Sequence, residues 1–250
     1  MIAIENVKKR YSDEVEIGPL NIKIPRAGIT SLIGPNGAGK STTLLMIGRL
    51  LKMDEGHIMV ANMDVSSSKS QDLAKILTIL RQENHFVTRL TVRQLVGFGR
   101  YPYSKGRLTE KDEEIISKYI DFLGLTELEN RYLDELSGGQ RQRAYVAMVL
   151  SQETEYVLLD EPLNNLDIAR SVQMMEHLRY AADNFGRTIV IVLHDINFAA
   201  KYSDRICAMK DGKIAAFGTV EEIMKPELLS DIFETEIDVI RGPYGPIAIY

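Results

Sequence analysis

The stretch GPNGAGKST, Gly34 to Thr42, decides the fold of this 250-residue chain. It follows the apolar run ITSLI, which is typical of a buried strand, and precedes a predicted helix from Thr42 to Leu51. Glycines let the backbone wrap closely around an anion, and the N–H groups of a helix start point toward it. The complete spacing Gly-x4-Gly-Lys-Ser predicts a triphosphate-binding loop, with Lys40 on the β- and γ-phosphates and Ser41 on Mg²⁺. The alternative is a glycine-rich turn without a ligand.

A second stretch, LSGGQRQR from Leu136 to Arg143, also pairs glycines with a predicted helix start. The helix is expected to run through Ala144 and Val149, with its N-terminal dipole available to an anion. The chain therefore carries two candidate phosphate cradles.

Polar side chains follow the apolar runs that we expect to form neighbouring strands. Asp160 ends YVLLD and Glu161 follows it, while His194 closes the next buried run and Gln82 follows KILTIL. Parallel sheets bind ligands at the carboxyl ends of their strands, so Asp160 is a candidate Mg²⁺ ligand and Glu161 could accept a proton from water. Alternatively, Asp160 and Glu161 only end a strand before a turn at Pro162, and His194 is structural. From its position alone, Gln82 receives no role.

The order of these patterns indicates an α/β fold. Residues 1–82 and 156–250 contain the strand-like runs and are expected to form a nucleotide-binding core with an antiparallel β subdomain. Residues 83–155 show helical spacing and are expected to form an inserted helical subdomain. We see no internal repeat or linker, so residues 1–250 are interpreted as a single domain.

Composition narrows the class of protein. The sequence is 45% apolar and 26% charged, which is ordinary for a soluble globular protein, and its formal net charge of −5 argues weakly against binding to nucleic acid. No run approaches eighteen apolar residues, and charges near the N-terminus replace the apolar block of a signal peptide, so we expect a cytoplasmic protein. Cys207 is the only cysteine, and the four histidines show no metal-ligand spacing.

These motifs together resemble the ATP-binding subunit of an ABC transporter, across nearly the whole chain. The resemblance implies a P-loop NTPase core of the RecA-like type, with ATP and Mg²⁺ as ligands. The implied nucleotide-binding residues are Tyr11, Gly34, Pro35, Asn36, Gly37, Ala38, Gly39, Lys40, Ser41 and Thr42. The implied Mg²⁺ ligands are Ser41, Gln82 and Asp160, and the implied catalytic residues are Glu161, His194 and Gln82. Asp167 ends the D-loop of this family.

In this family, two subunits pair head to tail, which explains the second cradle. The signature residues Ser137, Gly138, Gly139 and Gln140 are then expected to face the ATP of the partner subunit. Closure of such a homodimer around ATP, and its opening after hydrolysis, would move an attached membrane protein.

The segment from Leu90 to Thr109 is similar to the corresponding segment in the ATPases of bacterial importers of ferric siderophores, haem and cobalamin. The similarity lies in Arg100, Tyr101, Pro102 and Tyr103. It implies a membrane permease docking near residues 83–110, a substrate-binding lipoprotein as an indirect partner, and a peripheral location at the cytoplasmic face of the membrane. The alternative for this segment is a loop that packs on its own subdomain. An iron(III)-siderophore is the expected cargo, and haem and cobalamin are the alternative cargoes. Two alternatives for the function of the chain also stay open: a soluble ABC ATPase without a transporter, and an unrelated P-loop kinase or GTPase.

Overall fold

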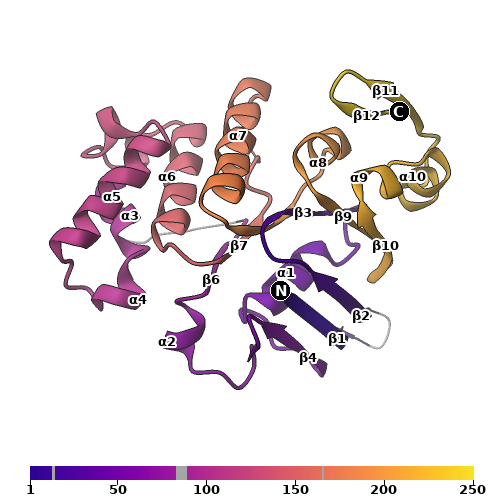
Figure 1. Ribbon diagram of the computed structural model, residues 1–250, viewed down its shortest axis with the longest axis horizontal. Helices are drawn as coiled ribbons and strands as arrows, with labels where there is room; N and C mark the ends of the chain where they lie inside the picture. Colours follow the sequence, from indigo (N-terminus) through magenta and orange to yellow (C-terminus); the bar gives the residue numbers. More distant parts are fainter. Residues whose placement is uncertain (13–14, 83–88, 165) are drawn as a thin grey trace.

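A computed structural model describes residues 1–12, 15–82, 89–164 and 166–250. Its central element is a six-stranded sheet of order β10-β9-β3-β8-β7-β6 (Figure 1). The strands are β10 (Lys213–Thr219), β9 (Arg205–Lys210), β3 (Gly28–Ile33), β8 (Thr188–Val192), β7 (Tyr156–Asp160) and β6 (Leu77–Leu80). All pairs are parallel except β9 with β10, which form a hairpin through Asp211 and Gly212, as the sequence predicts.

Both faces of the central sheet are buried. Successive residues of a strand point to opposite faces, so each strand supplies two separate hydrophobic cores. In β7, Val157 and Leu159 enter one core, and Tyr156 and Leu158 enter the other. This explains why the strands are continuous apolar runs rather than alternating ones.

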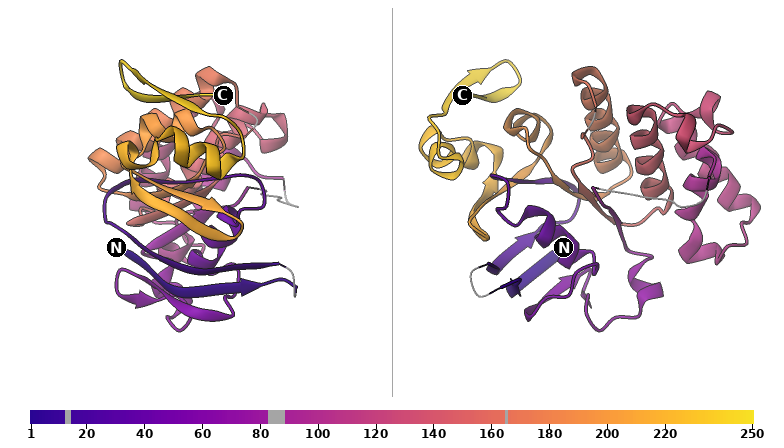
Figure 2. Two further views of the ribbon diagram at one scale, coloured as in Figure 1. Left: turned by 90° about the vertical axis from the view of Figure 1, so that its right-hand side faces the viewer. Right: turned by 180° about the vertical axis from the view of Figure 1, so that it is seen from behind.

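The first face is covered by α1 (Lys40–Ile47) and a four-stranded antiparallel sheet (Figure 2). This second sheet has the order β2-β1-β4-β5, with β1 (Ile2–Arg10), β2 (Glu16–Ile24), β4 (Glu55–Val60) and β5 (Met63–Asp64). Our prediction of a helix from Thr42 to Leu51 was wrong at both ends. The helix begins at Lys40, directly after its N-cap Gly39, and ends at Ile47, because Arg49 takes the left-handed conformation that commonly ends helices, with a φ of +59°.

Helices cover the other face. Those in contact with its strands are α6 (Gly138–Ser151), α7 (Ile168–Asn184), α8 (Ile196–Tyr202), α9 (Val220–Ile223) and α10 (Pro226–Phe233). The helices α3 (Val92–Phe98) and α5 (Glu110–Phe122) pack against α6 and complete the same hydrophobic core. The short α2 (Ser70–Leu73) precedes β6, and α4 (Tyr101–Ser104) follows α3. The chain ends in the hairpin β11 (Asp238–Gly242) and β12 (Gly245–Ile249), which packs against α8.

The helices α3 to α6 lie together at one end of the molecule (Figure 1). They fall between β6 and β7, in the part of the chain where an inserted helical subdomain is expected. Residues 83–88 of that expected subdomain lie outside the described residues, and its bounds stay a prediction. Across the described part of the chain, no helix combines the length and apolar character that crossing a membrane requires.

Candidate functional site

The loop between β3 and α1 encloses the Lys40 side chain. Lys40 is 5% exposed, and its Nζ donates to the carbonyl oxygens of Gly34 and Pro35, both at 2.8 Å. Burial lowers the pKa of Lys40, while the carboxylates of Glu161 and Asp160 oppose this effect. The ammonium group thus lies inside the loop, where phosphate oxygens can replace the two carbonyl groups.

Gly34 fixes the path of this loop. Its φ of +141° is uncommon for residues with a side chain, and a Cβ atom would lie 2.1 Å from the carbonyl oxygen of Met209. Only glycine can therefore bring the loop this close to β9.

The first residues of α1 reach the end of β7. Ser41 Oγ donates to Asp160 Oδ1 at 2.8 Å, which brings together two of the predicted Mg²⁺ ligands. Asp160 is 3% exposed, and burial raises its pKa although the Ser41 hydrogen bond opposes the rise. A hydroxyl and a carboxylate are suitable oxygen ligands for Mg²⁺. Within the described ranges, no three His, Cys, Asp or Glu side chains gather to hold a metal.

Glu161 lies at the centre of a polar cluster at the carboxyl ends of β6, β7 and β8. His194 Nε2 is 2.7 Å from Glu161 Oε1, and Gln82 Nε2 donates to Oε2 at 2.8 Å. Asn164 Nδ2 also donates to Oε2, at 2.5 Å. The structure therefore brings the three predicted catalytic residues into direct contact.

The resemblance includes Asn164 only as the first residue of the D-loop, NNLD from Asn164 to Asp167, and assigns it no role. The sequence indicates a turn here, because proline and asparagine are common in turns. It does not show that the Asn164 amide reaches the Glu161 carboxylate.

The signature residues form the start of α6. Ser137 is the N-cap: its side chain accepts from the Gln140 N–H, and the Gln140 side chain accepts from the Ser137 N–H. Gly138 and Gly139 occupy the first turn, as the sequence predicts for a helix start. The helix α6 lies with α3 to α5 at one end of the molecule, whereas α1 lies against the central sheet (Figure 1). The two glycine-rich segments therefore occupy separate places in the molecule.

Two other predicted residues have local roles. The Tyr11 ring is 55% exposed, and its hydroxyl lies 3.1 Å from Thr42 Oγ1, beside the start of α1. Asp167 is the N-cap of α7, where Oδ1 accepts from the Arg170 N–H at 2.8 Å. The D-loop residue before Leu166, Asn165, lies outside the described residues.

Comparisons with known proteins agree with these motifs. Residues 17–164 match the family described as ABC transporter. The chain is 83% identical over 250 residues to the petrobactin import ATP-binding protein FatE of Bacillus anthracis, covering 100% of both chains. It is 46% identical to the petrobactin import ATP-binding protein YclP of Bacillus subtilis (strain 168), covering 100% of this chain and 99% of that protein.

A solved structure also matches the fold. The ATP-binding cassette MJ0796, in a dimeric post-hydrolysis state bound to ADP and Pi, has a TM-score of 0.79 and 27% identity. The match covers 88% of this chain and 99% of that chain.

Proposed function

Because the chain belongs to the ABC transporter family, we propose that it is the ATP-hydrolysing subunit of an importer of a ferric siderophore of the petrobactin class. The substrate class is supported by the 83% identity to a petrobactin import protein over the whole chain. The chemistry is supported by one observation above all: Glu161 directly follows the Ser41–Asp160 pair at the end of β7.

The residues of this edge divide the work of hydrolysis. The Lys40 ammonium stabilises the negative charge that grows on the γ-phosphate as a water oxygen attacks phosphorus and the bond to ADP breaks. Glu161 orients that water and accepts its proton, and His194 lies beside the same carboxylate. Ser41 and Asp160 would hold Mg²⁺, which neutralises phosphate charge when bound. Gln82 donates a hydrogen bond to the Glu161 carboxylate and thus contacts the proposed base directly.

We propose that ATP is enclosed by two copies of the chain arranged head to tail. The exposed cradle at Ser137 then faces the γ-phosphate held by Lys40 of the other copy, because a helix N-terminus attracts an anion. In a mixture of Lys40→Ala and Ser137→Glu chains, heterodimers carry one intact composite site and one doubly damaged site. We expect turnover above the sum of the two separate variants; no gain, with each variant still binding its partner, contradicts this arrangement.

A groove in the helical group is the proposed docking site for the permease. It encloses about 480 Å³ and is lined by Leu90, Arg93, Gln94, Gly97, Phe98, Tyr101, Ser104, Gly106, Leu108 and Glu113. Three of its apolar side chains are well exposed: Phe98 by 47%, Tyr101 by 60% and Leu108 by 42%. An apolar groove of this kind fits an amphipathic helix. Residues 83–88 of the predicted docking segment lie outside the described residues.

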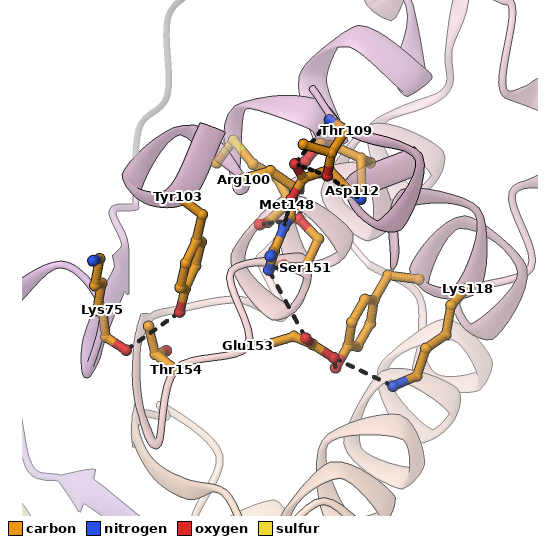
Figure 3. A network of polar contacts seen from close by, with 12 residues as sticks. Lys75, Arg100, Tyr103, Thr109, Asp112, Lys118, Met148, Ser151, Glu153 and Thr154 are labelled. Carbon is orange, nitrogen blue, oxygen red and sulfur yellow. Dashed lines mark hydrogen bonds and ion pairs between the residues drawn. The ribbon is translucent and has the colours of Figure 1, made fainter. Parts of the chain in front are cut away.

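A polar network around Arg100 lies next to Tyr101 in the chain and joins the start of α4 to α5 and α6 (Figure 3). Arg100, only 5% exposed, donates from Nε to Asp112 Oδ1 and from Nη1 to the Ser151 carbonyl, both at 2.9 Å. Its guanidinium lies 4.3 Å from the centre of the Tyr103 ring. Arg100 thus packs on its own subdomain, and the Tyr103 hydroxyl donates to the Lys75 carbonyl at 3.4 Å, just before β6. Tyr101 lines the groove instead.

Docking can be tested by co-purification from membranes. Tyr101→Asp places a charge in the apolar groove, and we expect it to abolish recovery of a polytopic permease and uptake of iron(III)-petrobactin. Tyr244→Asp is the matched control, because Tyr244 is 84% exposed at the tip of the terminal hairpin. Equal recovery with both variants contradicts the docking site. Wild-type iron uptake in a strain without this chain contradicts the importer function.

We further propose a peripheral position at the cytoplasmic face of the membrane, with a substrate-binding lipoprotein as the indirect partner. Both follow from the importer function. An importer ATPase acts on a membrane permease, and the permease receives the chelate from a substrate-binding protein. Fractionation of cells with and without the permease genes tests the location: the chain should leave the membrane fraction when the permease is absent.

A further inference from the structure

Asn164 is tied to Glu161 twice. Its side-chain Nδ2 donates to Glu161 Oε2 at 2.5 Å, and its backbone N–H donates to the Glu161 carbonyl at 3.2 Å. Both bonds lie within one turn, between the end of β7 and the N-cap Asp167 of α7. The amide is therefore held at one oxygen of the carboxylate by the local backbone.

The three donors around the carboxylate are unevenly distributed. Among the residues that the structure describes, Oε2 accepts from both Gln82 and Asn164, whereas Oε1 contacts His194 alone. An ionised carboxylate offers about four acceptor positions, two on each oxygen. Asn164 and Gln82 together fill Oε2, so the open position is on Oε1, next to His194.

We propose that Asn164 is a positioning residue for hydrolysis, which fixes the Glu161 carboxylate so that Oε1 meets the attacking water; this rests on the role of Glu161 proposed above. The last torsion of a glutamate side chain is broad and nearly two-fold, so covalent geometry does not select one oxygen. The φ of Glu161 is +50°, an uncommon value for a non-glycine residue that is typical of functional sites. Its side chain is 9% exposed, so neighbouring side chains rather than bulk water determine its orientation.

Asn164→Leu tests this role, because leucine is similar in size and donates no hydrogen bond. The lost bond is made to a charged group, so we expect kcat of the purified full chain to fall about 10- to 100-fold. KM for ATP should stay within about two-fold, because Asn164 contacts Glu161 and not the nucleotide-binding loop. Asn184→Leu is the matched control: Asn184 is exposed at the end of α7, and its amide donates to the Tyr180 carbonyl at 3.3 Å. It should leave kcat unchanged.

A double-mutant cycle separates positioning from a structural role. In the Glu161→Gln background, Asn164→Leu should lower the remaining single-turnover rate by less than about two-fold, because its target carboxylate is gone. An equal fall in both backgrounds, or an unchanged kcat in the wild-type background, overturns the inference. If Glu161→Gln alone leaves turnover unchanged, the proposed role of Glu161 fails instead.

Asn164→Asp provides a second variant of equal size, for use if the leucine variant does not fold. Its carboxylate cannot donate to Glu161 Oε2 and repels it, so kcat should fall at least as far as with leucine. A folded Asn164→Asp chain with wild-type kcat also overturns the inference.

Discussion

Two glycines of the same loop should respond very differently to alanine. Gly34 and Gly37 both have positive φ values, +141° and +80°. A Cβ atom on Gly37 meets nothing within 4 Å, whereas one on Gly34 lies 2.1 Å from the Met209 carbonyl oxygen. Met209 follows Ala208, which pairs with Ile33 in the central sheet, so this carbonyl cannot move without disturbing the pairing of β3 with β9.

The structure sets the size of each effect. Gly37→Ala should cost about 1–2 kcal/mol of unfolding free energy, the strain of a left-handed alanine. Gly34→Ala adds overpacking of about 1–3 kcal/mol to strain of about 1–3 kcal/mol, giving about 2–6 kcal/mol. For a chain of this size, each kcal/mol lowers Tm by about 2–4 °C. We therefore expect a fall of about 2–8 °C for Gly37→Ala and of about 4–24 °C for Gly34→Ala.

Thermal unfolding followed by circular dichroism measures both variants, and urea unfolding at one temperature gives the free energies directly. The same samples should be titrated with ATP, because a displaced loop binds phosphate weakly. Equal Tm values for the two variants, or a Gly34→Ala chain within about 1 °C of wild type, would refute the reasoning from the close approach to Met209.

Four further outcomes are expected. Glu161→Gln should bind ATP and accumulate as a closed dimer in gel filtration with ATP and Mg²⁺; a monomer with unchanged turnover contradicts the role of Glu161. Lys40→Ala should weaken ATP binding about 10- to 100-fold in calorimetry, because a charged donor is lost. Burial would raise the pKa of Asp112, but hydrogen bonds from Thr109 and the Arg100 side chain leave it below its usual value. The stability that wild type gains over Asp112→Asn should therefore be complete above about pH 5 and shrink as pH falls below about 4 in urea unfolding. Burial raises the pKa of Cys207 to about 12, so a thiol reagent at pH 8 should label it only after unfolding, and rapid labelling of the folded chain contradicts its burial.

The sequence predicts those parts of the fold that a local pattern determines. The strands around the Asp211–Gly212 turn and the helix that starts at Ser137 have clear signals, and the structure contains both. The α/β fold with a helical insertion and the resemblance to the ATP-binding subunits of ABC transporters are confirmed by the family match and the similar solved structure. The extent of α1 was predicted less well, because the chain leaves the helix through Arg49, a non-glycine residue with a φ of +59°, which the sequence pattern does not show.

Three residues of the site could be predicted because they stand where the sequence indicates that a strand ends. Asp160, Glu161 and His194 each follow a buried apolar run, and parallel pairing brings such ends to one edge. Gln82 and Tyr11 were identified only through the resemblance, and their roles in catalysis and nucleotide binding stay predictions. The Asn164 contact requires the actual path of the turn after β7. Likewise, burial of Arg100 beside an exposed Tyr101 depends on how α3, α5 and α6 meet.

The N-cap of α6 determines which chemical groups Ser137 can present to its surroundings. Ser137 Oγ already accepts the Gln140 N–H at 3.3 Å, and a hydroxyl has one proton and two lone pairs. The proton is therefore the group that remains to bind an anion, together with the N–H groups of the first turn. An aspartate at this position would cap the helix equally well, yet it would bring no proton and a negative charge. Serine and aspartate at position 137 would therefore stabilise the helix alike, but only serine can donate a hydrogen bond to an anion without adding a negative charge.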